Sequence, residues 1–454
     1  MKTYNKRIAF LISDQHFIPH GGIGQFAKGF TEMCDRIGWK VDILLDKDPT
    51  NAFSSVVSGL GSNIVCPRDP LKYTDHVATF AFSDTINFEK IINFRKCILQ
   101  AFESNIYDMI VCNTQEAMSA AYAMGISKYI PVMFYTHLHS MIFRKAQNFN
   151  DVFIEAYHNF YNKHMEFPDI IIGTQSQKNI TELTSNGAVN CQLLRMPMSE
   201  RGLLEAYTGP REGVLFIGRW EEGKNPDAYV RVMKECGLPC RVMTSKSGVK
   251  KFQNAFAQAG ITNYDIRAGI TGQAKVDFIR SSSVFFMPSM RENYPFAFLE
   301  CVGHMPTVVL DKQDWSENFK EVYYKMPLDK VSEFIKTVYD VDQSHYYTDV
   351  GALDYVRKLD EDTAMGWMRF MNSFVGSESK SNVAKINTYT TTKYKDFIDG
   401  LGRSHLARED FESVLANAHK FRVIYTDDDT YLTKDPAFKP AASVAQGAGL
   451  FEGL

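Results

Sequence analysis

The chain has 454 residues, of which 45% are hydrophobic and 13% aromatic, so it can form about two or three domains with large buried cores. Its formal net charge of −3 excludes a basic nucleic-acid coat protein and an acidic tail protein. A nucleic-acid partner would therefore require a local basic patch.

The cysteines are scattered along the chain, and several lie in apolar runs, where a free cysteine acts as a small core residue. Cys236 and Cys240 are close in sequence, but no further Cys or His pair completes a zinc pattern. The apolar run at residues 8–12 is too short for a signal peptide, and no run approaches the roughly 20 residues of a membrane span. These features predict a cytoplasmic protein with no membrane partner and no structural metal. They leave the oligomeric state open.

The first 198 residues alternate between strand and helix patterns. Residues 7–13 are predicted as a strand, a helix follows from about residue 25 to 36, and residues 40–45 form the next strand, which is typical of a right-handed βαβ unit. Further strands are predicted at residues 63–66, 109–112, 132–135 and 170–173, and further helices near residues 87–104, 116–124, 151–165 and 177–185. The pattern predicts a doubly wound α/β domain over residues 1–198.

Residues 196–210 are predicted as a linker, after which the alternation starts again. Strands are predicted at residues 213–218, 241–244, 264–267, 284–288 and 306–310, and helices at residues 227–236, 249–259, 273–281, 296–303, 331–339 and 360–374. A second doubly wound domain is therefore predicted over residues 211–375.

Two glutamates flank the start of one of these helices. Glu292 lies in the loop after the strand at residues 284–288, and Glu300 lies on the helix that follows. The carboxyl ends of parallel strands form the ligand-binding edge of such sheets, and the N–H groups of Phe296 and Ala297 would point at an anion there. By spacing alone, two solvated acids remain the simpler interpretation.

Arg219 and Lys224 stand at the equivalent edge of the second domain. Arg219 ends a predicted strand, and Lys224 precedes a helix that Pro226 opens. Two cations in these places can neutralise a diphosphate, the arginine as a fork and the lysine as a point charge. The alternative is a solvated loop with ordinary charges.

A glycine-rich segment follows the first strand of the chain. Gly21, Gly22, Ile23 and Gly24 lack the glycine spacing of the dinucleotide fingerprint. Near-adjacent glycines nevertheless allow a phosphate to approach the backbone closely, with a helix N-terminus behind it. An ordinary flexible turn is the alternative.

His137 and His139 follow the predicted strand at residues 132–135, and Arg144 and Lys145 come shortly after. A lone histidine is usually structural, whereas two at a sheet edge favour a ligand site. The spacing could suit a metal, but the sequence shows no third ligand.

In their order along the chain, these four motifs resemble those of the retaining glycosyltransferases of family four, over residues 7–312. The resemblance implies the GT-B fold, in which two Rossmann-like domains face each other across a cleft. It further implies that residues 382–419 cross back to the first domain, so that residues 376–454 comprise these helices and a loose tail.

The same resemblance implies a UDP-sugar donor, no cofactor and no metal. The glycine segment would contact the donor diphosphate and sugar, Arg219 and Lys224 would clamp the phosphates, and His137 would contact the sugar. Glu292 would also meet the sugar, and Glu300 would hold the nucleotide ribose.

Residues 134–145 also resemble a narrower group, the DNA α-glucosyltransferases of T-even phages. The matching residues are His137, His139, Arg144 and Lys145, while Leu138 replaces the acid that those enzymes carry between the histidines. This resemblance implies transfer of glucose, or of a pentose such as arabinose, to 5-hydroxymethylcytosine of phage DNA in an infected bacterium. Such a base must be rotated out of the duplex to react.

The sequence thus predicts a retaining glycosyltransferase with double-stranded DNA as its partner. A basic rim for DNA is predicted from Arg144, Lys145, Lys246, Lys250 and Lys251. One alternative keeps the fold and replaces DNA by a cell-surface glycan or a lipid carrier. A second is a non-catalytic protein that binds a nucleotide sugar or DNA, although the intact charged motifs favour an enzyme.

Overall fold

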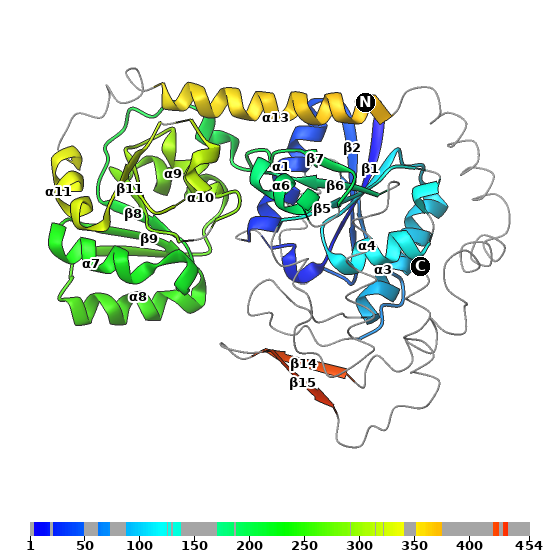
Figure 1. Ribbon diagram of the computed structural model, residues 1–454, viewed down its shortest axis with the longest axis horizontal. Coiled ribbons are helices and arrows are strands. Elements are labelled where there is room, and N and C mark those ends of the chain that lie inside the picture. Colours follow the sequence, from blue (N-terminus) through cyan, green and yellow to red (C-terminus); the bar gives the residue numbers. More distant parts are fainter. Residues whose placement is uncertain are drawn as a thin grey trace. The chain divides into compact units, whose positions relative to one another are not determined.

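The computed structural model is shown in Figure 1. It describes residues 4–18, 21–49, 62–72, 88–124, 126–128, 130–137, 170–185, 188–290, 292–313, 315–320, 322–339, 351–374, 421–425 and 430–434. The chain divides into two compact units. Unit 1 comprises Met1–Ile18, Thr31–Arg195 and Trp367–Leu454, and unit 2 comprises Pro19–Phe30 and Met196–Gly366.

Unit 1 is built on a parallel sheet with the strand order β3-β2-β1-β4-β5-β6-β7. Its strands are β1 (Lys6–Ile12), β2 (Trp39–Leu45), β3 (Ile64–Val65), β4 (Met109–Cys112), β5 (Val132–Tyr135), β6 (Ile170–Thr174) and β7 (Cys191–Leu193). The central strands are continuous apolar runs, as expected for strands that helices cover on both faces. In β1, for example, every residue from Ile8 to Ile12 is fully buried.

The helices of unit 1 are α3 (Phe88–Ser104), α4 (Gln115–Ala123) and α6 (Gln177–Ser185), and both units share α1 (Gly22–Arg36) and α13 (Ala352–Phe374). The boundary between the units falls within α1 and within α13. The C-terminal part of α13 brings Trp367 into the core of unit 1, where its indole is fully buried. Trp367 stacks on Tyr135 with ring centroids 5.8 Å apart, and its Nε1 donates to the carbonyl of Arg195 at 2.9 Å.

Unit 2 contains a second parallel sheet, with the order β10-β9-β8-β11-β12-β13. Its strands are β8 (Val214–Ile217), β9 (Cys240–Thr244), β10 (Tyr264–Ala268), β11 (Val284–Met287), β12 (Thr307–Leu310) and β13 (Tyr324–Met326). Its helices are α7 (Pro226–Cys236), α8 (Lys246–Ala259), α9 (Gly272–Arg280), α10 (Phe296–Val302) and α11 (Leu328–Tyr339). Numbered from β8, this is the 3-2-1-4-5-6 order of a Rossmann sheet.

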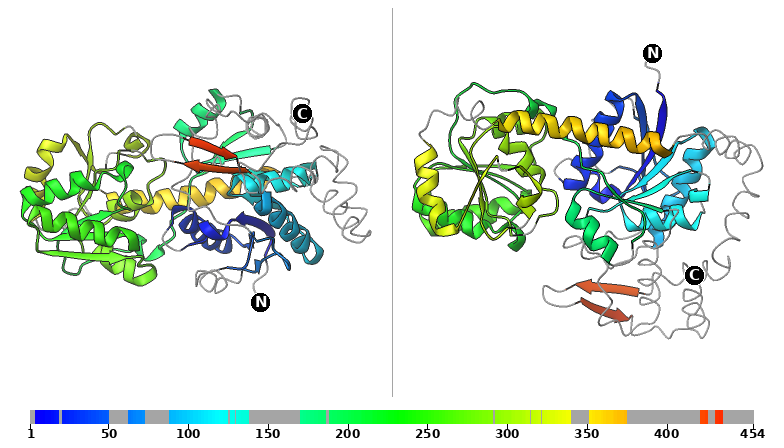
Figure 2. Two further views of the ribbon diagram at one scale, coloured as in Figure 1. Left: turned by 90° about the horizontal axis from the view of Figure 1, so that it is seen from below. Right: turned by 45° about the horizontal axis from the view of Figure 1, so that its top comes forward.

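Helices cover both faces of the second sheet, with α7 and α8 on one side and α9 and α10 on the other (Figures 1 and 2). Alternate strand residues such as Phe216 and Phe286 pack under α7 and α8 against Tyr229 and Phe252. The residues between them, such as Phe285, point to the opposite face and are also buried. The two doubly wound sheets that the sequence predicted are confirmed.

Several boundaries differ from the sequence prediction. Helix α1 begins at Gly22 rather than near residue 25, and α13 begins at Ala352 rather than at residue 360. The short edge strands β7 and β13 were not predicted. Within residues 376–454, the structure describes one antiparallel pair, β14 (Phe421–Tyr425) and β15 (Thr430–Lys434). The predicted helix at residues 151–165 and the predicted crossing segment at residues 382–419 lie outside the described residues.

Across the described ranges, none of the helices combines the length and the apolar character that crossing a bilayer requires.

Candidate functional site

The candidate site of unit 2 lies where the strand order of its sheet reverses. Strands β8 and β11 are parallel neighbours at that point, with the remaining strands added outward on either side. Ligands of open α/β sheets bind outside the carboxyl ends of such a strand pair. Arg219 and Lys224 follow β8, and Glu292 follows β11, so three predicted site residues come from the two loops at this point.

These two loops are bonded to each other. The ammonium of Lys224 donates to Glu292 with an N–O distance of 2.5 Å, and the backbone N–H of Met290 donates to the carbonyl of Gly223 at 2.8 Å. Asn225 has a left-handed backbone with φ of 51° and stands at the N-cap of α7. This conformation ends the short 3-10 turn that carries Lys224 and starts α7 directly behind it.

The charges at this point are partly removed from water. The side chain of Glu292 is 9% exposed and that of Lys224 is 24% exposed. The guanidinium of Arg219 lies 3.0 Å from Glu221. Burial lowers the pKa of Arg219, and the carboxylates of Glu221 and Glu292 oppose the shift, so the group stays a cation. The arrangement offers two cations, each paired with a carboxylate.

Glu300 is buried inside α10, where only 2% of the residue is exposed. Its carboxylate is ion-paired with the ammonium of Lys275 on α9. Burial raises the pKa of Glu300, and Lys275 acts against that shift. Phe296 and Ala297 are the first residues of α10, so their N–H groups have no acceptor within the helix.

A second buried ion pair lies beside the first, and the sequence did not predict it. The ammonium of Lys28 on α1 donates to Glu200 at 2.8 Å, and the other oxygen of Glu200 accepts the backbone N–H of Gly272 at 3.3 Å. Lys28 and Glu200 are 172 positions apart, and Lys275 and Glu300 are 25 apart. No local pattern could have paired them.

The glycine segment takes a different form from the predicted loop. Gly22, Ile23 and Gly24 form the first turn of α1, and the N–H of Gln25 donates to the carbonyl of Gly21 at 2.8 Å. A Cβ atom added at Gly22 would meet nothing within 4 Å. The helix N-terminus therefore begins inside the glycine segment rather than behind it.

His137 lies in unit 1, directly after β5. Its Nε2 is 3.2 Å from the side-chain oxygen of Asn113, and its carbonyl accepts a hydrogen bond from Gln175 at 3.0 Å. Burial, with a smaller contribution from His16, lowers the pKa of His137 to about 3. The imidazole is therefore neutral near pH 7, with Nε2 as a hydrogen-bond donor to Asn113.

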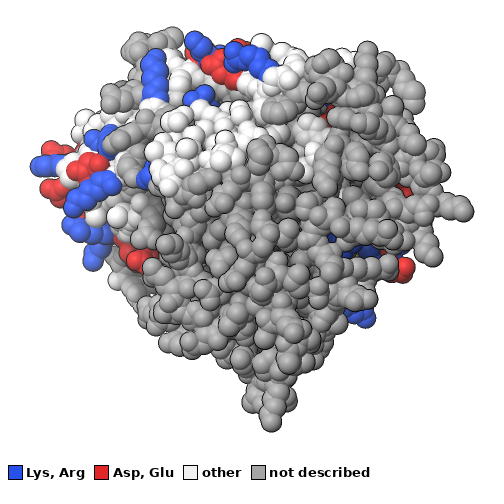
Figure 3. All heavy atoms as spheres, turned by 45° about the vertical axis from the view of Figure 1, so that its right-hand side comes forward, with Lys and Arg blue, Asp and Glu red and all other residues white. Residues whose placement is uncertain are grey.

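The basic rim predicted for DNA is only partly within the described residues. Lys246, Lys250 and Lys251 are exposed on α8. On the face drawn in Figure 3, basic and acidic side chains of the described residues are interspersed rather than gathered by sign. His139, Arg144 and Lys145 lie outside the described residues.

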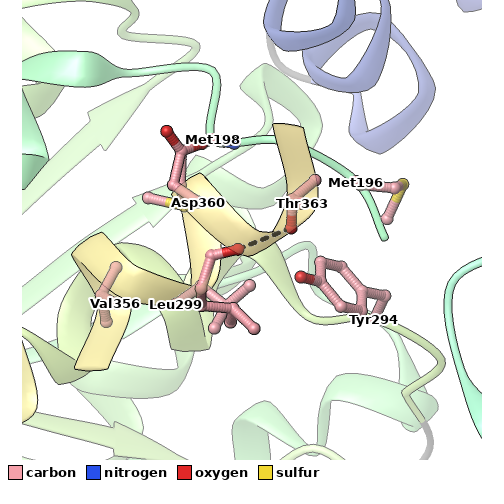
Figure 4. Close-up of a pocket in the computed structure, with 8 residues that line it drawn as sticks. Met196, Met198, Tyr294, Leu299, Val356, Asp360 and Thr363 are labelled. Carbon is pink, nitrogen blue, oxygen red and sulfur yellow. Dashed lines mark hydrogen bonds between the residues drawn. The ribbon is translucent and has the colours of Figure 1, made fainter. Parts of the chain in front are cut away.

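A small pocket in unit 2 lies between the segment at Met196 and Met198 and helix α13 (Figure 4). Its cavity volume of about 10 Å³ is roughly the space that one water molecule needs. Asp360 at its edge accepts the backbone N–H of Met198 at 3.1 Å and is ion-paired with Arg201. This pocket is a packing gap rather than a nucleotide site.

Within the described part of the chain, no group of three or more His, Cys, Asp or Glu side chains could hold a metal ion.

Neither a family model nor a curated protein matches the sequence. Solved structures do match it. TarM of S. aureus, in complex with fondaparinux, alpha-GlcNAc-glycerol and UDP, has a TM-score of 0.57 and 10% identity, covering 81% of this chain and 100% of TarM. HepE of Anabaena, with UDP and glucose, has a TM-score of 0.55 and 13% identity, covering 81% and 99%.

Sucrose-phosphate synthase from Thermosynechococcus elongatus gives a TM-score of 0.53 at 12% identity and covers 87% of this chain and 100% of its own. Likeness at this level of identity establishes the fold and leaves the activity to the site residues. Two Rossmann-like units and these structural neighbours show that the chain has the GT-B fold, as the sequence predicted.

Proposed function

We propose that the chain is a glycosyltransferase that takes its sugar from a nucleotide-sugar donor of the UDP class. The observation that carries this proposal is the meeting of Arg219, Lys224 and Glu292 outside β8 and β11, at the strand-order reversal of a Rossmann sheet. Two GT-B structures that resemble this chain, HepE and TarM, were solved with UDP bound.

In this proposal, Arg219 and Lys224 balance the negative charge that grows on the diphosphate as the bond to the sugar breaks. Preorganised charges of this kind usually make the largest single contribution to catalysis. The diphosphate competes with Glu292 for the ammonium of Lys224. Glu292 can then accept a hydrogen bond from a hydroxyl group of the donor sugar, while neutral His137 contributes a hydrogen bond to the same sugar.

In this proposal Glu300 holds the nucleotide by accepting hydrogen bonds from the ribose hydroxyls. The N–H groups at the start of α10 and of α1, from Phe296, Ala297 and the segment Gly21 to Gly24, face the phosphates. Retention of the anomeric configuration rests on the sequence resemblance alone. It is tested by NMR of the anomeric proton in the transfer product.

The donor assignment is tested by calorimetric titration of the protein with UDP. Arg219→Ala and Lys224→Ala are expected to weaken binding at least about tenfold, because each removes one charge partner of the diphosphate. Arg231→Ala is the matched control, since Arg231 is 61% exposed on α7 and pairs only with Glu235 among the contacts described. Failure of the wild-type protein to bind UDP or a UDP-sugar would reject the proposal.

The acceptor remains the prediction made from residues 134–145, namely 5-hydroxymethylcytosine in double-stranded DNA. Mass spectrometry of hydroxymethylated DNA, incubated with the protein and a panel of UDP-sugars, tests it directly. A mass increase identifies both the acceptor and the sugar. UDP release without DNA modification favours a glycan or lipid-carrier acceptor, and binding of the UDP-sugar without UDP release favours the non-catalytic alternative.

A further inference from the structure

Four of the buried charged residues of unit 2 form one connected cluster around Glu300. Its members are Lys28, Glu200, Lys275 and Glu300, and each is at most 9% exposed. Lys275 pairs with Glu300 and Lys28 pairs with Glu200. The cluster thus holds two cations and two anions with no net charge when all four are ionised.

The two ion pairs are joined through helix α9. Glu200 accepts the N–H of Gly272, the first residue of α9, at 3.3 Å, and Lys275 lies one turn later on the same helix. Gly272 has a left-handed φ of 59°, a conformation that favours glycine. Glu200 therefore holds the start of the helix that presents Lys275 to Glu300.

Burying four charges is costly, and apolar residues of similar volume often stabilise a protein at least as well as a buried ion pair. The two ion pairs are therefore weak evidence that the cluster serves stability alone. A carboxyl group accepts hydrogen bonds from ribose hydroxyls more strongly when it is ionised. Burial opposes that ionisation for Glu300, and Lys275 supports it.

We propose that Lys275, Lys28 and Glu200 are positioning residues for Glu300. The two lysines keep Glu300 ionised, and Glu200 holds the start of α9, so that Glu300 is oriented to accept hydrogen bonds from the ribose hydroxyls of the donor nucleotide. This inference rests on the proposed function, because it takes Glu300 as the ribose ligand. The charged and titratable groups that face Glu300 are Lys275 from α9, Glu200 from the segment before residue 201, Lys28 from α1 and Cys301 from its own helix.

The signs of the expected effects differ between the members of the cluster. Lys275→Met removes the cation nearest to Glu300, so Glu300 takes up a proton at higher pH. Lys28→Met acts in the same direction, because it leaves Glu200 as an unbalanced neighbouring anion. Its effect should be weaker, because Lys28 contacts Glu200 rather than Glu300. Glu200→Gln acts in the opposite direction, because it removes that anion and leaves Lys28 charged.

The experiment measures the affinity for UDP by calorimetric titration between pH about 5.5 and about 8.5. At each pH the affinity is divided by that of Glu300→Gln, which cancels the effect of the phosphate ionisation of UDP itself. For Lys275→Met, affinity is expected to be about tenfold or more weaker at pH 6 than at pH 8. Lys275→Arg should restore the wild-type profile, and Lys234→Met, an exposed lysine of α7, should leave it unchanged.

If Lys275→Met fails to fold, the opposite shifts of Lys28→Met and Glu200→Gln decide the question. If the cluster is purely structural, all the variants should have lower melting temperatures. The pH dependence of their UDP binding should then not shift in opposite directions between the lysine variants and Glu200→Gln. Superimposable profiles in variants that bind UDP would overturn this inference and leave the donor assignment standing. Absence of UDP binding by the wild-type protein would instead overturn the donor assignment, and the ribose role of Glu300 with it.

Discussion

At the scale of single residues, the cations of the candidate site are held in place by acids. Lys224 is paired with Glu292, and Arg219 with Glu221. Such pairing fixes both cations before any ligand arrives, so little reorganisation is needed when a diphosphate takes over the contacts. The site is therefore expected to respond to the loss of either cation mainly in the rate of transfer.

Arg219→Ala and Lys224→Ala should each reduce kcat about 10²–10³-fold, the usual effect of removing one preorganised charge partner of a transition state. Steady-state kinetics with a UDP-sugar provides the measurement, and thermal melting serves as the control for folding. Lys224→Arg keeps the charge and should lose less activity. Wild-type rates in both alanine variants would contradict the assignment of this pair to the diphosphate.

The two glutamates should separate binding from turnover. Glu300→Gln is expected to weaken UDP binding about tenfold, because an uncharged amide is a poorer acceptor for ribose hydroxyls than a carboxylate. Glu292→Gln should not weaken UDP binding, because it frees Lys224 for the diphosphate, and it should reduce kcat, since the partner of Glu292 in the donor is the sugar. Calorimetry and kinetics on the same preparations would distinguish the two, and equal UDP affinity of wild type and Glu300→Gln would contradict the split.

At the scale of elements, helix α1 packs closely against the backbone of Pro197 and Met198 at Gly29. A Cβ atom on Gly29 would lie 2.6 Å from the carbonyl oxygen of Pro197 and 3.2 Å from the backbone of Met198. Backbone cannot move aside as a flexible side chain can. This close approach sets the distance between α1 and the segment that continues to Glu200, and hence the geometry of the Lys28 pair.

Gly29→Ala should therefore lower the free energy of unfolding by about 1–3 kcal/mol, the range for overpacking, despite the better helix propensity of alanine. Gly366→Ala on α13 is the matched control, because its Cβ would meet nothing within 4 Å. That variant should gain up to about 1 kcal/mol. Chemical denaturation of both variants gives the comparison, and stabilisation by Gly29→Ala would refute the packing argument.

The elements also show what could be predicted from the sequence. Strands such as β1, β8 and β11 are buried on both faces, and their continuous apolar runs made them recognisable. Edge strand β13 has only three residues, of which two are half-buried and one is exposed. It is therefore too short for a recognisable alternation of apolar and polar residues. The first half of α13 is highly charged, and its start is marked only by Gly351, with φ of 61°.

The candidate site follows the same division. Arg219 and Glu292 were found because each follows a recognisable strand, and neighbouring parallel strands bring their loops together. Lys28, Glu200 and Lys275 were missed because their pairing depends on how α1 and α9 pack, which the local sequence does not encode.

At the scale of the whole molecule, buried neutral histidines make stability depend on pH. His304 is 1% exposed, and its Nε2 lies 2.7 Å from the carbonyl oxygen of Leu203, to which it donates in the neutral form. Burial lowers the pKa of His304 to about 4. A histidine in the unfolded chain titrates near 6.5. Between these pH values the unfolded state binds more protons, so stability falls as pH decreases from 6.5 towards 4.

His304→Gln keeps a donor for Leu203 and removes this proton uptake. Urea unfolding of wild type is expected to lose on the order of 1–2 kcal/mol more between pH 7 and pH 5 than that of the variant. Tryptophan fluorescence follows the transition, with Trp220 and Trp315 reporting on unit 2. The expectation fails if both proteins lose the same free energy over this range.

The position of Trp367 in unit 1 has a consequence for the order in which a ribosome can deliver a finished protein. Tyr135 and Arg195 emerge early, but the indole that covers one and bonds to the other follows Arg195 by 172 positions. All of Met196–Gly366 is synthesised in between, and with it unit 2 is complete. The unit that begins at the N-terminus is therefore the last to close. A nascent chain that has released Gly366 but not Trp367 would carry a complete unit 2 and a first core that still lacks its cover.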